Sequence, residues 1–276
     1  MDVERHPELF ALDEKGNPTQ VAGVPPDFFS KTGQLWGYPL YRWDRMAEDG
    51  YRWWIERLRT AFRMTDIVRL DHFRAFAAYW AVPAGDPTAM NGQWLPGPGR
   101  KLFDAARAEL GDVPLVAEDL GTITPDVRRL LAKLRLPGMK VLQFAFYEED
   151  SPYLPHRHVP NAVVYTGTHD NDTTRGWWAT LDAGARRRAA AYLGTDGSDI
   201  EWAMIRAAYA SVADRAIVPL QDVFGLGSEA RMNTPSEAQG NWSFRVRDEH
   251  FRNDRNARLL ELAQLTGRRK KESSGP

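Results

Sequence analysis

The sequence predicts an α/β fold in which a parallel sheet is covered by helices on both faces. Short runs rich in Val, Ile, Leu, Phe and Ala alternate along the chain with segments of helical periodicity. The apolar runs are nearly continuous, as expected for parallel strands buried on both sides, and such alternation is typical of α/β proteins. The predicted strands are residues 66–70, 113–117, 140–146, 162–166 and 216–220.

Helix starts are marked by capping residues. Thr124 precedes Pro125, which suits an N-cap followed by proline at the first helical position. Ser198 and Glu201 have the spacing of a capping box, in which each side chain bonds a backbone N–H of the first turn. The helix that begins there is expected to carry its apolar residues on one face, namely Trp202, Ile205, Tyr209 and Val212.

Helix ends and strand number together suggest part of a barrel. Gly111 and Gly194 follow helical patterns, where a left-handed residue commonly ends a helix. Before residue 66 the sequence predicts one helix, near residues 45–62, and a long Gly/Pro-rich loop. Five strands fall short of the eight in a (β/α)₈ barrel. Two alternatives are open at this point: an open five-stranded sheet, or a chain that lacks the first strands of a barrel.

The net charge and the aromatic content of the chain indicate which kind of ligand to expect. The net charge of −1 gives no reason to expect nucleic acid or an anionic membrane as a partner. There are no cysteines, and no long apolar stretch, so a cytoplasmic protein is predicted. The chain has 10 Trp, 9 Tyr and 12 Phe, several of them in Gly/Pro-rich segments. Because sugar rings have apolar faces that stack on exposed aromatic rings, a carbohydrate ligand is the first hypothesis.

Acidic residues end three of the predicted strands. Asp71 ends the first and Glu118 the second, while either Asp170 or Asp172 ends the fourth. A single such residue is more often a helix cap or a surface turn. In a parallel barrel, however, the carboxyl ends of all strands lie on one face, and that face holds the active site. Three acids at strand ends therefore predict a carboxylate cluster.

Retaining glycosyl transfer needs two such carboxylates. One is an ionised nucleophile and the other a protonated acid, with the carboxyl groups roughly 5–5.5 Å apart. Arg69 lies two residues before Asp71, hence on the same side of the strand, where it would favour the ionised form. The acid needs a dry pocket or a nearby like charge. Asp119 is not expected to supply that charge to Glu118, since adjacent strand residues face opposite ways.

Seven segments resemble the amylomaltase family, also called disproportionating enzyme, whose members are relatives of the α-amylases. The resemblance extends to about residue 267 and implies a retaining 4-α-glucanotransferase acting on α-1,4-glucans. It also implies an α/β (β/α)₈ TIM barrel of the α-amylase superfamily, here incomplete, with about strands 4–8 present and the first strands missing. The segments are residues 21–30 (VAGVPPDFFS), 33–41 (GQLWGYPLY), 68–74 (VRLDHFR), 116–121 (VAEDLG), 136–144 (LPGMKVLQF), 165–174 (YTGTHDNDTT) and 226–233 (LGSEARMN).

The resemblance implies a role for each matched residue. Asp71 matches the nucleophile, Glu118 the general acid/base, and Asp170 the third carboxylate, which binds sugar hydroxyls. Other matched residues are expected to contact sugar, and those in the loop 21–41 are expected to cover the acceptor side of the cleft and favour a sugar acceptor over water. For Trp36, packing against the barrel is an equally good interpretation. The expected sugar contacts are Arg69, His72, His169, Phe28, Phe29 and Trp36.

The remaining expectations concern domains and ligands. Residues 1–267 are predicted to form one catalytic domain and 268–276 a disordered polar tail. No cofactor or metal is expected, and His156 and His158 are assigned to a solvated loop. Ser236 follows Pro235 where the family usually has glycine. The expected partners are maltooligosaccharides and α-1,4-glucans; the functional alternatives are an α-glucan hydrolase and an inactive fragment that at most binds glucan.

Overall fold

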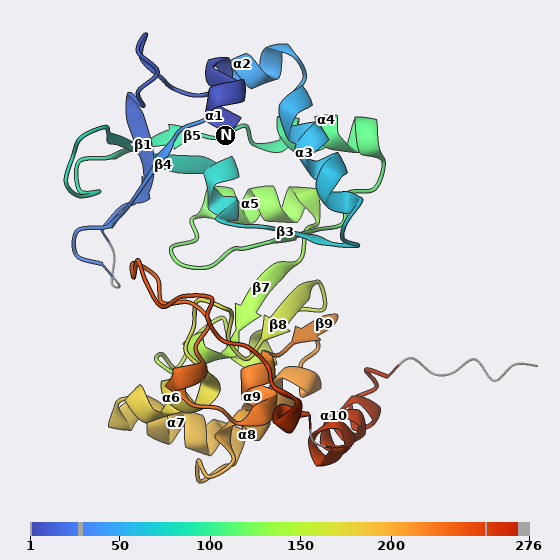
Figure 1. Cartoon of the computed structure of the whole chain (residues 1–276). Coiled ribbons are helices and arrows are strands. Elements are labelled where there is room, and N and C mark those ends of the chain that lie inside the picture. The colour runs from blue at the N-terminus through green and yellow to red at the C-terminus, as the bar shows by residue number, and fades with distance from the viewer. Residues whose placement is uncertain (1, 27–29, 252, 270–276) are drawn as a thin grey trace, which may run out of the picture. The chain divides into compact units, whose positions relative to one another are not determined.

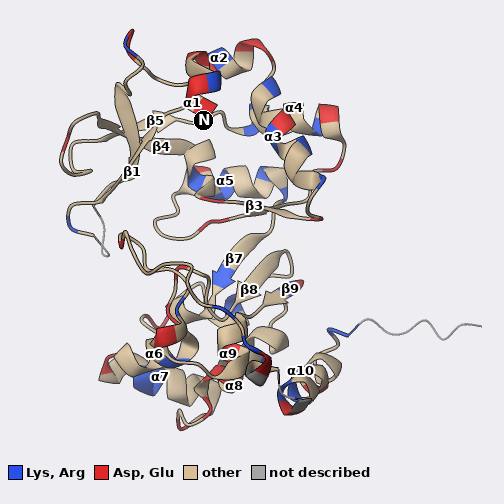
Figure 2. Cartoon of the chain, in the orientation of Figure 1, with Lys and Arg blue, Asp and Glu red and all other residues tan. Residues whose placement is uncertain are grey.

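The computed structural model describes residues 2–26, 30–251 and 253–269 of the chain. The chain divides into two compact units, Met1–Gly138 and Met139–Pro276, each with its own hydrophobic core (Figure 1). Charged residues of both signs mix over the helices of each unit (Figure 2), in keeping with the net charge of −1. No helix within the described residues is long and apolar enough to cross a membrane.

The first unit combines a parallel strand pair with an antiparallel sheet. Strands β3 and β6 run parallel, as predicted. The segment predicted to be a Gly/Pro-rich loop instead contributes two strands to a four-stranded antiparallel sheet of order β2-β1-β4-β5. Its strands are β1 (Gln20–Val24), β2 (Gln34–Pro39), β4 (Ala78–Pro83) and β5 (Gln93–Pro96); the parallel pair is β3 (Val68–Leu70) and β6 (Leu115–Ala117).

The helices of the first unit pack around a core of aromatic and aliphatic side chains. The single helix expected near residues 45–62 is two helices, because Gly50 and Tyr51 both have positive φ (71° and 63°) and break the hydrogen-bond ladder. As predicted, Pro125 opens a helix after an extended Thr124. The elements are α1 (Asp2–Arg5), η1 (Pro7–Leu9), α2 (Trp43–Glu48), α3 (Arg52–Phe62), η2 (Phe73–Phe76), α4 (Arg100–Leu110) and α5 (Pro125–Leu134).

The second unit is built on a three-stranded sheet of order β7-β8-β9, in which β8 and β9 are parallel. Its strands are shorter than predicted, since a 3₁₀ turn follows β7 directly and Leu220 begins a helix. The elements are β7 (Gly138–Val141), η3 (Leu142–Phe144), η4 (Pro155–Arg157), β8 (Ala162–Tyr165), α6 (Thr174–Thr180), α7 (Ala183–Leu193), α8 (Ile200–Ala210), β9 (Arg215–Ile217), α9 (Leu220–Phe224), η5 (Ser228–Ala230), η6 (Asp248–His250) and α10 (Asn253–Leu265).

The predicted capping box at helix α8 is wrong. The helix starts after Asp199, and the hydroxyl of Ser198 donates to Asp196 instead. Glu201 is buried and accepts a hydrogen bond from Arg175 at 2.7 Å, so its carboxylate is used in the core. Val212, which was expected on the apolar face, lies beyond the helix end and is exposed. The spacing predicted a cap at Glu201, but its carboxylate is buried and paired with the half-exposed Arg175 instead.

Three further predictions concern the helix-ending glycines, His158 and the C-terminal tail. Gly111 and Gly194 both end helices at positive φ, as predicted. His158 is not on a solvated loop: it is buried, with its ring nitrogens 2.7 Å from Ser211 Oγ and 2.9 Å from Tyr153 O, and burial lowers its pKa. In the predicted tail, Arg268 donates to the carbonyls of Tyr209, Ser211 and Ala213. Residues 270–276 lie outside the described residues, and the disordered tail stays a prediction.

Candidate functional site

Asp71 and Glu118 lie side by side because they follow paired positions on adjacent parallel strands. Leu70 at the end of β3 lies opposite Ala117 at the end of β6. The pairing continues past the strands: Glu118 N–H donates to Leu70 O, and Phe73 N–H donates to Glu118 O, both at 3.0 Å. The predicted juxtaposition of these two carboxylates at strand ends is therefore present in the first unit.

The Glu118 carboxyl is partly buried and bonded to the backbone. His72 N–H donates to Oε2 at 2.7 Å and Leu120 N–H to Oε1 at 2.9 Å. Burial nevertheless raises the pKa of Glu118, outweighing these bonds and the nearby Arg69, while the charge of Asp71 adds to the increase. Asp119 takes no part, since its carboxylate lies against Gly138, where a Cβ would come within 2.5 Å of Oδ2. Burial thus shifts the pKa of Glu118 in the direction that a general acid needs.

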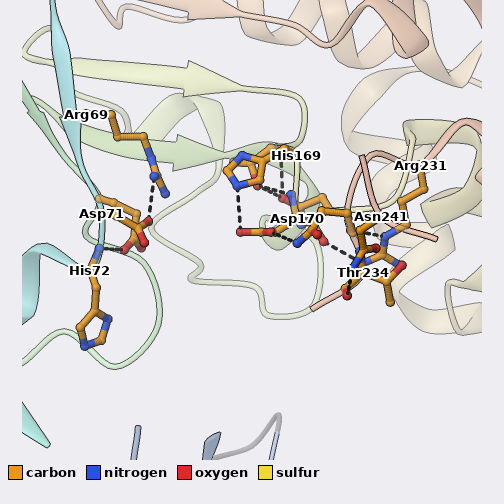
Figure 3. Close-up of polar contacts among 12 residues, drawn as sticks. Arg69, Asp71, His72, His169, Asp170, Arg231, Thr234 and Asn241 are labelled. Carbon is orange, nitrogen blue, oxygen red and sulfur yellow. Dashed lines mark hydrogen bonds and ion pairs between the residues drawn. The ribbon is translucent and has the colours of Figure 1, made fainter. Parts of the chain in front are cut away.

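Asp71 has the opposite environment. Its side chain is 79% exposed and forms an ion pair with Arg69, whose Nη1 lies 2.7 Å from Oδ1 (Figure 3). The Asp71 carboxylate is thus solvated and paired with a guanidinium, whereas that of Glu118 is partly buried. Two neighbouring carboxyl groups therefore differ in the way acid and nucleophile must differ in a retaining glycosidase.

His72 contacts both the Glu118 carboxylate and Trp36, which lies on the hairpin formed by β1 and β2. Its backbone is left-handed (φ 46°), and its N–H donates to Glu118 Oε2 at 2.7 Å. Its ring meets Trp36 of β2 edge-on, with centroids 4.7 Å apart. Burial and the charge of Arg74 lower the pKa of His72 to about 4, so the ring is neutral at neutral pH. Trp36 thus contacts the site while staying 37% exposed; Phe28 and Phe29 lie outside the described residues.

Asp170 is held in the second unit by residues from a distant segment of sequence. Asn233 Nδ2 donates to its Oδ1 at 2.6 Å, and Arg231 donates to its main-chain carbonyl at 2.7 Å. His169 Nε2 lies 3.4 Å from its Oδ2, and Asn233 N–H donates to the His169 carbonyl (Figure 3). The carboxylate keeps 45% exposure. The sequence included Arg231 and Asn233 in a matched segment but gave them no role.

Asp172, the other candidate on this segment, is used within the fold. Its Oδ1 accepts from Thr173 N–H and its Oδ2 accepts from Ser228 Oγ, both at 2.7 Å. Its main-chain carbonyl accepts from Gln143 at 2.9 Å. With both carboxylate oxygens engaged at the start of helix α6, Asp172 is less suited than Asp170 to bind a ligand.

Asp222 positions the segment that carries Asp170. This carboxylate is 1% exposed and accepts from Thr166 Oγ1 (2.6 Å), Thr174 N–H (2.7 Å) and Thr174 Oγ1 (2.8 Å). Thr166 follows β8 and Thr174 begins α6, so one side chain fixes both ends of the connection. Sequence reasoning missed it, because Asp222 lies two residues beyond the predicted strand 216–220, in helix α9, which was not predicted.

Each unit therefore holds part of the predicted carboxylate trio. The first brings together Asp71, Glu118, Arg69, His72 and Trp36, and the second brings together His169 and Asp170. That all three carboxylates share one cleft stays a prediction. Among the described residues, no group of His, Asp or Glu side chains is arranged to hold a metal ion.

Comparison with known proteins gives the family. A family model described as "4-alpha-glucanotransferase" matches residues 1–250. The chain belongs to this family. It is 51% identical to the chloroplastic/amyloplastic 4-alpha-glucanotransferase of Arabidopsis thaliana, covering 97% of this chain and 47% of that protein. It is 49% identical to the 4-alpha-glucanotransferase of Thermus thermophilus, covering 97% of this chain and 55% of that protein.

The solved structures agree with the predicted fold. The amylomaltase from Streptococcus agalactiae, solved in complex with acarbose, superposes with a TM-score of 0.93 at 39% identity, over 96% of this chain and 54% of that one. The predicted α/β fold, part of a TIM barrel of the α-amylase superfamily, is thus confirmed. The chain spans about half the length of the curated relatives it matches.

Proposed function

We propose that this chain carries the catalytic carboxylates of a retaining 4-α-glucanotransferase, which transfers α-1,4-glucan segments between maltooligosaccharides. The observation that carries the proposal is the contrast between two neighbouring carboxyl groups. Burial raises the pKa of Glu118, whereas Asp71 is exposed and paired with Arg69 at 2.7 Å. The relatives named 4-alpha-glucanotransferase support the same reaction class.

The proposed reaction has two displacements at the anomeric carbon. In the first, the Asp71 carboxylate attacks this carbon while Glu118 gives its proton to the departing glycosidic oxygen. In the second, a sugar hydroxyl of the acceptor attacks the glycosyl–Asp71 ester, and Glu118 takes the hydroxyl proton. Arg69 pairs with the Asp71 carboxylate at 2.7 Å and orients it before the first step. The configuration at the anomeric carbon is inverted twice and so retained.

The other predicted contacts would bind the sugar. Asp170 has an exposed carboxylate that can accept hydrogen bonds from sugar hydroxyls, and His169 beside it can add another contact. Neutral His72 can donate or accept, and Trp36 offers an apolar ring next to it. The hairpin of β1 and β2, which includes Trp36, is proposed to favour a sugar acceptor over water.

The decisive experiment incubates the purified protein with maltotriose and compares Asp71→Asn with the parent. The parent should release glucose and longer oligomers, and Asp71→Asn should lose turnover while still binding maltooligosaccharide. Asp104→Asn is the matched control, because Asp104 is also paired with an arginine, Arg100, at 2.9 Å, but on helix α4. Near-normal transfer by Asp71→Asn would reject the assignment of the nucleophile.

The same assay separates the alternatives. Products that only shorten would indicate an α-glucan hydrolase with water as acceptor. Binding of maltooligosaccharide without any turnover would indicate a glucan-binding chain that is not active by itself. A cytoplasmic location stays a prediction of the sequence.

A further inference from the structure

Trp242 presents an exposed indole beside the Asp170 segment. Its side chain is 55% exposed, although tryptophan is a residue that folding usually covers. Its ring lies against that of His169, with centroids 5.3 Å apart and planes inclined by 35°. The indole is thus packed on the ring of His169, which neighbours the Asp170 carboxylate, and about half of its surface stays open to solvent.

The backbone at Trp242 is strained. Its φ is +59°, a left-handed conformation that is unfavourable for a bulky residue and that glycine adopts freely. Strained residues persist only where the surrounding structure holds them, and they gather at functional sites. A surface loop with no task for the indole would be more stable with glycine at this position.

Hydrogen bonds hold the strained loop in place. Trp242 N–H donates to Met232 O at 2.7 Å. The side chain of Asn241 accepts from Thr234 N–H at 2.8 Å and donates to the carbonyls of Thr234 and Glu237 at 3.3 and 2.9 Å (Figure 3). The ring is therefore fixed before any ligand arrives, which lowers the entropy lost on binding.

The same loop is tied to Asp170. Asn233, adjacent to Met232, donates from its side chain to Asp170 Oδ1 and from its main chain to the His169 carbonyl. The indole and the carboxylate are thus parts of one hydrogen-bonded assembly. An apolar plane beside a carboxylate matches a pyranose ring, which has an apolar face and hydroxyls around its edge.

We propose that Trp242 is a stacking platform for a glucose ring of the α-1,4-glucan, positioned beside the carboxylate of Asp170. The proposal rests on the proposed function for the class of ligand, and it adds a binding residue to that site. Stacking on the indole face holds the ring while Asp170 and His169 bond its hydroxyls.

The test uses Trp242→Gly, because packing and binding predict opposite effects for it. Glycine relieves the strain at φ +59°, so the free energy of unfolding in urea should be unchanged or higher. Affinity for maltohexaose, measured by calorimetry, should fall by about tenfold, in line with the worth of an aromatic contact. Trp242→Phe should retain affinity within roughly threefold, because it keeps an aromatic face.

Tyr192→Ala is the matched control. Tyr192 on helix α7 is 41% exposed and also stacks on a histidine, His156, at 5.8 Å and 33°. Its loss should leave maltohexaose affinity unchanged. Unchanged affinity in Trp242→Gly would overturn the proposal, as would a loss of affinity accompanied by an equal loss of stability.

The maltotriose assay keeps the two proposals apart. If the parent binds maltohexaose through Trp242 without transferring glucan, the proposed function fails and the stacking role stands. If the parent transfers glucan while Trp242→Gly binds normally, only the stacking role fails. If the parent binds no maltohexaose, both fail.

Discussion

Asp222 offers the sharpest test of how the second unit is held together. Replacing it with alanine removes the acceptor of three hydrogen bonds from a side chain that is 1% exposed. The two threonine hydroxyls can rotate toward other acceptors, but the Thr174 N–H cannot. Leaving a buried donor unsatisfied costs about 1–3 kcal/mol, and each lost hydroxyl bond costs less. We therefore expect Asp222→Ala to lower the free energy of unfolding by about 3 kcal/mol.

Asp222→Asn should cost much less, about 1 kcal/mol. Its remaining oxygen can accept from Thr174 N–H, and its amide can donate to the hydroxyl oxygens of Thr166 and Thr174. Asp182→Ala is the exposed control, since Asp182 also accepts two backbone N–H groups, from Gly184 and Ala185. It should lower the free energy of unfolding by less than Asp222→Ala does, because Asp182 is an exposed N-cap.

The measurement is urea unfolding of the four proteins at neutral pH, followed by far-UV circular dichroism. Equal losses for Asp222→Ala and Asp222→Asn would refute the reasoning, since a buried N–H left without an acceptor is what distinguishes them. A loss for Asp222→Ala no larger than that for Asp182→Ala would refute it as well. Unchanged m-values are needed for the comparison to report stability.

The pH dependence of stability gives an independent check on the same residue. Burial raises the pKa of Asp222, and the charge of Glu201 adds to this, against the three hydrogen bonds. Between the unfolded pKa, about 3.9 for aspartate, and the higher folded pKa, the folded state binds more protons than the unfolded state. This carboxyl therefore makes stability fall as pH rises through that window. Asp222→Asn should remove its share of the slope.

Two further predictions concern the turn before Trp242 and the proposed acid. Ser236 follows Pro235 and has φ +71°, in a turn closed by the bond from Glu237 N–H to Thr234 O. Because glycine adopts this φ without strain, Ser236→Gly should raise the free energy of unfolding by about 0.5 kcal/mol. Ser236→Ala should not raise it. Transfer needs Glu118 protonated in its first step, and burial raises its pKa, so the rate should fall as pH rises through a value above that of ordinary glutamate. A rate that keeps rising with pH past this point would contradict the assignment of Glu118 as the acid.

The structure explains what serine does at position 236, where the family usually has glycine. The family usually has glycine after this proline, and the sequence alone showed only that serine stands there. In the structure the position requires positive φ, the third position of a type II turn, which glycine adopts at no steric cost. Serine at this position therefore lowers the stability of the loop that also carries Trp242.

Local sequence predicted what depends on local properties. All five predicted strands exist near their predicted positions. Continuous apolar runs reflect burial on both faces for β6 and β8, whereas β9 is largely exposed. The contact of Arg69 with Asp71 followed from alternation along one strand. The errors lie where distant residues intervene. The buried carboxylate of Glu201 pairs with the half-exposed Arg175, and strand β1 of the Gly/Pro-rich segment pairs with β4.

The sequence by itself thus determined the family, the α/β class and the identity of the candidate carboxylates, since these are properties of residue type and order. Only the tertiary structure decided their environments. Register between β3 and β6 places Glu118 beside Asp71, and burial then separates acid from nucleophile. Asn233, Asp222 and Trp242 reach the Asp170 segment from 48 or more positions away in the chain, so no local pattern could have assigned them. Solvent exposure and long-range hydrogen bonds, which set a carboxyl group's chemistry, arise only when the chain is folded.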